Sequence, residues 1–279
     1  MSFSIPGYIE PFVHSAPPAS TVDHQKLDVL EGVRSILSVP GHQAGMVEGA
    51  RARGADRIAW DLEDSVPVSR KAEARGLVAA NARREDMVRV NAHDPDDVAA
   101  IRDRAGWINL PKVSSAADIQ ALRMLAPAIK VLAVIESPMA LMEVWPICRE
   151  ADAVAFGRAD FCAAAGLLDD GCSLVLHAMG QIAMAARAAG IPAFDSPCEV
   201  FNADAMLAEV SRAISYGFSG KICIHPDQIP ACRRFDPSVS DQAEAREIAS
   251  WRGSGARRCG DRLLAEPHYR LAERNARWP

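Results

Sequence analysis

The sequence predicts an α/β protein with a single (β/α)8 barrel domain, and three observations lead to this fold class. Short, uninterrupted apolar runs recur along the chain, which is typical of strands buried on both faces of a parallel sheet. Stretches with helix-like apolar spacing separate these runs. The pair of strand and helix repeats eight times, the number that closes such a barrel. An open doubly wound sheet is the alternative, but no G-x-G-x-x-G fingerprint follows the first strand.

The expected elements follow in order along the chain. The strands are expected at residues 35–39, 57–60, 87–91, 107–112, 131–135, 153–156, 192–195 and 221–225. The helices are expected at 46–53, 69–83, from 94, from 115, 139–150, 173–189, 203–216 and 241–251. Ser115 and Asp118 are capping residues for the fourth helix, and Gly190 and Gly217 end two later ones.

The barrel pattern divides the chain into three parts. Residues 1–30 contain Pro and Ser without a clear period, so we expect an arm or partner-contact segment there. Residues 31–252 form the barrel. Residues 253–279 are Arg-rich and weakly patterned, which predicts a tail that is either a short helix on a neighbour or partly disordered.

Composition excludes several classes of protein. Hydrophobic residues make up 49% of the chain and charged residues 24%, as in ordinary soluble domains, and the net charge of −5 gives no reason to expect a nucleic-acid partner. No apolar run is long enough to span a membrane, and no signal-like segment begins the chain. The seven cysteines have no CxxC spacing, which argues against a disulfide framework and a zinc site. We therefore expect a cytoplasmic protein.

Two carboxylates stand at the ends of the fifth and sixth strands. Glu136 follows the run 131–135, and Asp160 comes shortly after the run 153–156. Parallel-sheet enzymes place their chemistry at the carboxyl ends of strands, and paired carboxylates suit a hard cation such as Mg²⁺. The alternative is that Glu136 caps the following helix while Asp160 lies in a solvated loop.

An arginine stands within the third strand, where a charge is costly unless paired. Arg89 lies between Val88 and Val90, and a bidentate grip on a substrate carboxylate would satisfy it. The alternative is an internal ion pair with Asp61 or Glu63, which follow the second strand.

Other polar residues near strand ends have weaker claims to the site. Lys221 opens the eighth strand, at the end of a barrel that carries no chemistry, so we expect a structural role. Lys112 is better placed for a Schiff base, but nearby acids are expected to keep its pKa high. His225 is expected to tie down a loop, Gly41 to serve a turn or an anion, and Asp195 to hold a water or the substrate or to cap a loop.

Together these residues resemble the citrate lyase beta-subunit family, which includes citramalyl-CoA and malyl-CoA lyases and belongs to the metal-dependent aldolases built on a phosphoenolpyruvate/pyruvate-type barrel. Each matching motif alone is weak, but seven recur in the family's order and cover nearly the whole barrel. They are Arg34-Ser-Ile-Leu-Ser-Val-Pro-Gly41, Trp60-Asp-Leu-Glu-Asp-Ser-Val66, Val88-Arg-Val-Asn91, Leu110-Pro-Lys-Val113, Val134-Ile-Glu136, Phe156-Gly-Arg-Ala-Asp160 and Gly220-Lys-Ile-Cys-Ile-His-Pro226.

The resemblance implies a metal site and a set of catalytic residues. By this likeness Mg²⁺ binds Glu136 and Asp160, and Arg89 grips the substrate carboxylate. Asp61 and Glu63 organise the water shell of the metal and the arginine. The implied reaction is a reversible cleavage of a carbon–carbon bond by a retro-Claisen or retro-aldol route, with an oxo-acid and an enolate as fragments.

The resemblance also implies substrate-binding residues beyond Arg89 and Glu136. Gly157, Arg158 and Ala159 would help to hold the oxo-acid through backbone amides. Arg34, the first residue of the first motif, is included in the same set. A homo-oligomer, trimer or hexamer, is expected on the same ground.

The chain departs from the family where coenzyme A would bind. Members usually have Asn-Arg-Pro after the first Pro-Gly and a lysine in the next helix, whereas this chain has His42-Gln43-Ala44 and Gly49. We therefore carry three interpretations: a lyase for citramalyl-CoA or citryl-CoA, an aldolase or hydrolase for a free oxo-acid without CoA, and a catalytically idle subunit that binds metal and oxo-acid.

Overall fold

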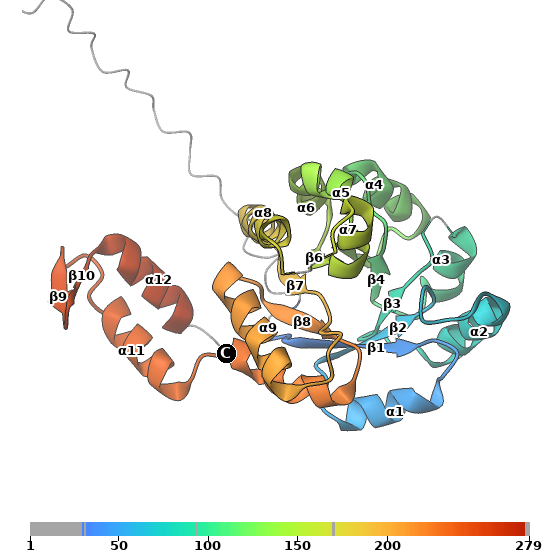
Figure 1. Ribbon diagram of the computed structural model, residues 1–279, viewed down its shortest axis with the longest axis horizontal. Coiled ribbons are helices and arrows are strands. Elements are labelled where there is room, and N and C mark those ends of the chain that lie inside the picture. Colours follow the sequence, from blue (N-terminus) through green and yellow to red (C-terminus); the bar gives the residue numbers. More distant parts are fainter. Residues whose placement is uncertain (1–29, 31, 93, 169–170, 277–279) are drawn as a thin grey trace, which may run out of the picture.

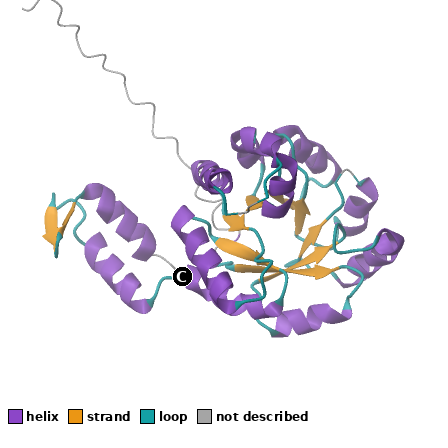
Figure 2. Cartoon of the chain, in the orientation of Figure 1, coloured by secondary structure: helices purple, strands orange, loops and turns teal. Residues whose placement is uncertain are grey.

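The computed structural model describes residues 30, 32–92, 94–168 and 171–276. Eight parallel strands pair in chain order and close into a barrel, and helices surround it (Figures 1 and 2). The predicted (β/α)8 barrel is confirmed.

All eight expected strands are present, and the third, fourth and eighth end earlier than expected. The barrel strands are β1 (Ser35–Pro40), β2 (Arg57–Asp61), β3 (Met87–Arg89), β4 (Trp107–Leu110), β5 (Lys130–Ile135), β6 (Ala153–Phe156), β7 (Ala193–Asp195) and β8 (Gly220–Cys223). The α-helices around them are α1 (Gly45–Ala52), α2 (Lys71–Asn81), α3 (Pro95–Ile101), α4 (Ala116–Leu125), α5 (Pro138–Met142), α6 (Val144–Glu150), α7 (Arg158–Ala165), α8 (Ser173–Ala189), α9 (Ala203–Tyr216) and α10 (Ile229–Cys232). Short 3-10 turns are η2 (Val68–Arg70), η3 (Pro226–Gln228) and η4 (Arg233–Phe235).

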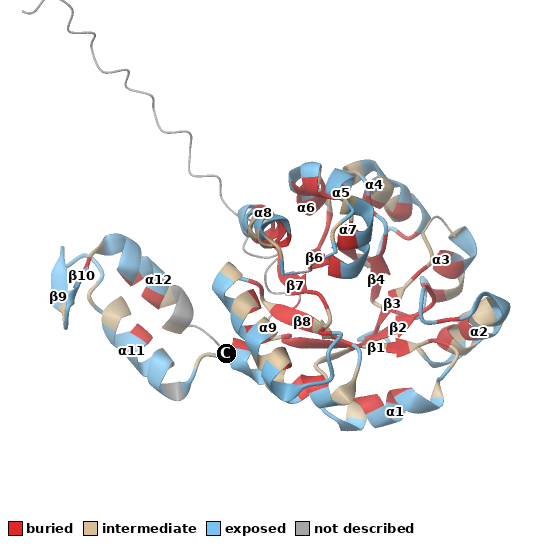
Figure 3. Ribbon diagram, viewed as in Figure 1, coloured by how far each residue is buried: buried red, intermediate tan, exposed pale blue. Residues whose placement is uncertain are grey.

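Along each strand, successive side chains point alternately into the barrel and outward to the layer beneath the helices. Ala59, Met87 and Trp107 belong to the cluster inside the barrel, whereas the residues after them pack outward against the helices. Side chains two residues apart on a strand point the same way. Asp61 and Arg89 therefore point inward as well, at the carboxyl ends of their strands. The barrel strands are the most buried part of the molecule (Figure 3).

The local helix predictions differ from the structure in two places. The single helix expected at 139–150 is broken into α5 and α6 at Glu143. Pro146 explains the break because it has no N–H to donate to the carbonyl four residues earlier. In addition, α7 begins at Arg158, directly after β6, where the sequence suggested only a loop before the helix at 173.

The C-terminal part of the chain is folded and differs from the expected tail. The segments α11 (Val239–Ala249), β9 (Arg257–Cys259), β10 (Arg262–Leu264) and α12 (Glu266–Ala276) form a helical pair with a small hairpin, set apart from the barrel (Figure 1). Tyr269 is fully buried there and donates to the carbonyls of Gly255 and Leu264. A boundary at residue 252 therefore cuts through this module.

The N-terminal arm predicted at 1–30 lies outside the described residues except for Leu30. Leu30 is buried in the cluster inside the barrel, so the barrel core begins there. Among the described residues, no helix has the length and apolar character needed to cross a membrane.

Candidate active site

The carboxyl ends of β2 and β3 are joined by an ion pair between Arg89 and Asp61. These residues are register partners, and the guanidinium binds the carboxylate in a bidentate fork, with Nε 2.8 Å from Oδ1 and Nη2 2.7 Å from Oδ2. Burial would raise the pKa of Asp61, but Arg89 and the amides of Ser65 and Glu63 hold it below its ordinary value. The internal ion pair, left open by the sequence, is present.

Arg89 also contacts two further carboxylates while remaining partly open. Its Nη1 lies 3.1 Å from Glu63 Oε2 and 3.6 Å from Asp64 Oδ2, and its side chain is 26% exposed. Burial would lower the pKa of Arg89, but Asp61 and the other acids raise it, so the cation persists at any working pH. The exposed part of the guanidinium remains available to a ligand carboxylate.

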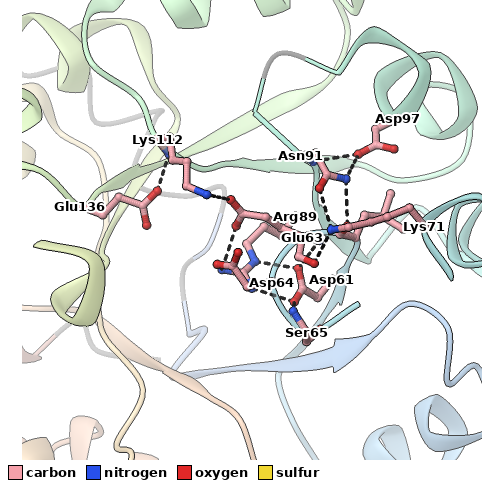
Figure 4. Close-up of polar contacts among 11 residues, drawn as sticks. Asp61, Glu63, Asp64, Ser65, Lys71, Arg89, Asn91, Asp97, Lys112 and Glu136 are labelled. Carbon is pink, nitrogen blue, oxygen red and sulfur yellow. Dashed lines mark hydrogen bonds and ion pairs between the residues drawn. The ribbon is translucent and has the colours of Figure 1, made fainter. Parts of the chain in front are cut away.

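Lys112 connects Glu63 with a further carboxylate, that of Glu136, at the mouth of the barrel, the opening formed by the carboxyl ends of the strands (Figure 4). Its Nζ lies 2.7 Å from Glu63 Oε1, and its backbone N–H donates to Glu136 Oε1. Lys112 has φ of +54°, a left-handed conformation that non-glycine residues seldom adopt and that often marks functional sites. The hydrogen bond to Glu63 raises the pKa of Lys112, as expected from the sequence, so its amine stays protonated. This disfavours a Schiff base.

Glu136 follows β5 and is the most perturbed carboxylate of the site. It is 6% exposed, and burial, with the nearby charges of Asp160 and Glu63, raises its pKa to about 7, against the hydrogen bond from the Lys112 amide. Gly157 packs directly on it, since a Cβ there would lie 2.6 Å from both Cβ and Oε2 of Glu136. Only glycine fits at this contact.

The donor set fits a divalent cation of the Mg²⁺ type. Around Arg89 and Lys112 stand five carboxylates, those of Asp61, Glu63, Asp64, Glu136 and Asp160. Within the described part of the chain no group of three His, Cys, Asp or Glu side chains is arranged to hold a metal ion. Mg²⁺ in proteins commonly uses one or two carboxylates and completes its shell with water and substrate. Glu136 and Asp160, the latter exposed in the first turn of α7, match that pattern.

The side chains of Arg34 and Arg158 lie outside the site, whereas the backbone of Arg158 begins α7 beside Glu136. Arg34 precedes β1 at the opposite end of the barrel, where its guanidinium binds Asp236. The side chain of Arg158 is buried and donates to Glu209 and to the carbonyl of Pro197. We therefore leave both side chains out of the proposed site. Ala159 is exposed at the start of α7, beside Gly157.

The structure also shows the contacts of the residues with weaker claims to the site. Asp195 is buried and binds Lys221, at 2.6 Å between Oδ2 and Nζ, so the structural role expected for Lys221 is confirmed. His225 caps the turn after β8 by accepting from the amide of Asp227, as expected for a loop-fixing residue. Gly41 is required by a close approach, because a Cβ there would lie 2.7 Å from the Asp61 carbonyl oxygen.

Sequence reasoning missed Lys71, which supports the carboxyl ends of the strands at this site. Lys71 Nζ binds the carbonyl of Leu62, 2.6 Å away, and Asn91 Oδ1, 2.7 Å away, and it also reaches the carbonyl of Glu63 (Figure 4). Lys71 thereby fixes the loop that presents Glu63. The sequence did contain a sign of this role. Lys71 stands in the first turn of the expected helix, where a cation is unfavourable unless its side chain binds groups outside the helix.

Comparisons with known proteins found similar sequences and similar solved structures. The model of the HpcH/HpaI aldolase/citrate lyase family matches residues 34–226. A citrate lyase subunit beta-like protein of Deinococcus radiodurans is 32% identical over 270 residues, covering 84% of this chain and 93% of the relative. A (3S)-malyl-CoA thioesterase of Cereibacter sphaeroides is 33% identical over 235 residues, covering 78% and 82%. The structure of CitE from Mycobacterium tuberculosis with magnesium, acetoacetate and coenzyme A superposes with a TM-score of 0.75 at 26% identity, covering 87% of this chain and 97% of that one.

Proposed function

Because the chain belongs to the HpcH/HpaI aldolase/citrate lyase family, we propose that it is a Mg²⁺-dependent carbon–carbon lyase. Its substrate is a 3-hydroxyacyl-CoA that bears a carboxylate, of the citramalyl-CoA or citryl-CoA type, and the products are an oxo-acid and acetyl-CoA. One observation supports the proposal most directly. The mouth holds more carboxylates than cations, and burial beside other carboxylates raises the pKa of Glu136 to about 7, so a bound cation would stabilise its ionised form.

The roles of the residues follow from their contacts. Asp61 holds one edge of the Arg89 guanidinium, so the remaining exposed surface can orient the substrate carboxylate. Glu136 and Asp160 are the proposed cation ligands, and Glu63 keeps Arg89 and Lys112 in place. Gly157 lets Glu136 pack directly against the backbone that follows β6. The amide of Gly157 donates to the carbonyl of Ile135, so the amides of Arg158 and Ala159, in the first turn of α7, are the ones proposed to hold the oxo-acid.

The bond changes balance without an outside reactant. The substrate hydroxyl loses its proton and becomes the carbonyl of the oxo-acid, while the electrons of the carbon–carbon bond pass to the carbon next to the thioester. That enolate takes up one proton and becomes acetyl-CoA. A bound Mg²⁺ would supply Lewis-acid polarisation of the oxygens of the oxo-acid fragment. Arg89 and Lys112 remain positive throughout and offset developing negative charge.

Two specific observations favour other members of the same superfamily. His42-Gln43-Ala44 and Gly49 replace basic residues expected for coenzyme A, which favours an aldolase or hydrolase acting on a free oxo-acid. The similarity to a (3S)-malyl-CoA thioesterase favours thioester hydrolysis. The idle-subunit interpretation is disfavoured by the presence of Arg89, Glu136 and Asp160 together.

The test is turnover of citramalyl-CoA and of citryl-CoA with Mg²⁺ and again with excess EDTA. We expect Mg²⁺-dependent release of acetyl-CoA, and a loss of at least about a thousandfold in Glu136→Gln, as for removal of a group central to transition-state stabilisation. The matched control Glu244→Gln changes an exposed glutamate of α11 and should leave turnover intact. Release of free CoA without an oxo-acid would establish a thioesterase. No turnover, with Mg²⁺-dependent pyruvate binding, would favour the CoA-free aldolase.

We also propose a cytoplasmic homo-oligomer, trimer or hexamer. Solution scattering would give its mass directly, and a monomeric mass would refute this part of the proposal.

A further inference from the structure

Part of the barrel interior stays accessible below the level of Glu136. Val134 and Ile222 pack on the cluster inside the barrel. Ser38 lies two residues after Ile36 of that cluster, so its side chain points inward as well. Residues that fill a (β/α)8 barrel are normally packed into a closed core. These three side chains are instead only half-buried, so the mouth continues downward between them.

This lower space adjoins the proposed metal and substrate site. Val134 in β5 is two residues before Glu136, so both side chains point inward. Gly157 lies against both, since a Cβ there would be 2.6 Å from the Cβ of Glu136 and 3.1 Å from Cγ1 of Val134. Asn109 of β4 is the register partner of Arg89. The lower space therefore opens from the site itself.

Within the described part of the chain, two hydrogen-bonding side chains of this space are buried without a partner. Asn109 is two residues after Trp107, which belongs to the cluster inside the barrel, and it is 3% exposed. Ser196 is two residues after Phe194 of the same cluster and is 2% exposed. Neither Asn109 Oδ1 nor Ser196 Oγ has a hydrogen-bond partner in that part of the chain. Buried polar groups are nearly always hydrogen-bonded, so these two inward-pointing groups indicate a place for a polar group of a ligand.

The chemistry of these groups fits a carboxylate on a short arm. A serine hydroxyl donates a hydrogen bond, and an asparagine amide donates once its N–H₂ group is turned to the ligand. The hydroxyl of Ser38, which is half-buried, is a third donor. Arg89 beside Asn109 keeps its positive charge, which favours an anion. A methyl group would leave the two buried groups unsatisfied, and a site built for hydrogen bonds discriminates strongly against such a ligand.

We propose that Asn109 and Ser196 determine the specificity of the site by binding a second carboxylate on the oxo-acid half of the substrate. This inference rests on the proposed function and decides between its two substrate types. The carbon that becomes the oxo carbon bears a methyl group in citramalyl-CoA and a carboxymethyl group in citryl-CoA. The carboxymethyl group supplies the second carboxylate, so the chain should prefer the citryl-CoA type.

The test compares kcat/KM for citryl-CoA and for citramalyl-CoA with Mg²⁺ present. The unchanged protein should favour citryl-CoA at least about tenfold, as expected for additional hydrogen bonds to a charged group. Asn109→Leu should lower kcat/KM for citryl-CoA at least about tenfold more than that for citramalyl-CoA. The control Asn81→Leu makes the same change at an exposed asparagine of α2 and should keep the preference.

A stability measurement separates this role from a structural one. Asn109→Leu puts apolar atoms in place of a buried amide oxygen that has no partner among the described residues, so the urea midpoint of unfolding should not fall. A lower midpoint together with an unchanged preference would make Asn109 a structural residue. Ser196→Ala removes the second group with a smaller change in volume and should weaken the preference in the same direction, which keeps the inference testable if Asn109→Leu does not fold.

The outcomes distinguish this inference from the proposed function. Equal kcat/KM for the two substrates in the unchanged protein, or a preference that neither variant lowers, overturns the subsite while the proposed function stands. A preference for citramalyl-CoA overturns it as well. If neither substrate is cleaved with Mg²⁺, the proposed function fails, and the inference fails with it.

Discussion

Two networks of ionised side chains flank the barrel strands, and they differ in charge balance and in exposure. The mouth network consists of Asp61, Glu63, Asp64, Arg89, Lys112, Glu136 and Asp160. The wall network, between β7, β8, α7 and α9, consists of Arg158, Asp195, Glu209 and Lys221. The wall network pairs two carboxylates with two buried cations, and a third cation, Arg212, lies at its edge, 4.0 Å from Glu209. The mouth network sets five carboxylates against two cations.

The pKa shifts follow this difference. In the wall network burial would raise the pKa of Glu209, but Lys221 and Arg158 lower it overall. In the mouth network the pKa of Glu136 is raised, because burial and two neighbouring carboxylates outweigh the hydrogen bond it accepts. An ionised group that is unfavourable where it stands is typical of a binding or catalytic site, whereas a balanced buried set is typical of structure. The same residue types therefore serve two different purposes in one barrel.

The largest effect is expected in the wall network. Lys221→Met leaves Asp195 and Glu209 buried without that cation, and we expect the free energy of unfolding to fall by about 3–5 kcal/mol. Urea unfolding measures it. The matched change Lys112→Met removes a half-exposed lysine from the mouth and should cost at most about 1 kcal/mol. Similar losses in the two variants would remove the distinction between the networks.

An effect of opposite sign is expected at Glu136 in the metal-free protein. Its pKa is about 7 in the folded state against 4.5 for the ordinary side chain, so the unfolded chain releases the proton first. Stability should therefore fall as pH rises from 4.5 through 7, and Glu136→Gln should gain about 3 kcal/mol at pH 8 and nothing near pH 4. Thermal unfolding in EDTA across this range checks it.

Glu209→Gln is the counterpart, and its sign should be reversed. The lowered pKa of Glu209 means that its contribution is present above pH 4.5 and is lost as pH falls below that value. The variant should thus be less stable than the unchanged protein at pH 8 and approach it in acid. A stability gain at pH 8 would contradict the comparison.

The smallest effect is expected from the backbone of Lys112. Lys112→Gly relieves the left-handed conformation, so it should be about 1 kcal/mol more stable than Lys112→Ala, which removes the same side chain but keeps the strain. Chemical unfolding of the two variants isolates the backbone contribution. No difference between them would mean that the conformation is not strained.

The strand positions could be predicted from the sequence because each is a local property. A strand buried on both faces needs an uninterrupted apolar run, and all eight runs were visible. The residues that follow those runs were visible too, so Asp61, Glu136 and Asp160 were expected at one mouth. Asp61 and Arg89 are indeed register partners at neighbouring strand ends. The helix α7 and the C-terminal module lacked a clear apolar period and were missed or misdivided.

What the sequence by itself determined is the barrel and the set of polar residues at its strand ends. Only the tertiary structure decided which of them share a site. Asp195 pairs with Lys221 across 26 positions, and Arg34 with Asp236 across 202, so neither pairing leaves a local pattern. The raised pKa of Glu136, the φ of Lys112 and the burial of the Asn109 amide likewise arise only when the barrel closes, because burial and approach between distant strands create them.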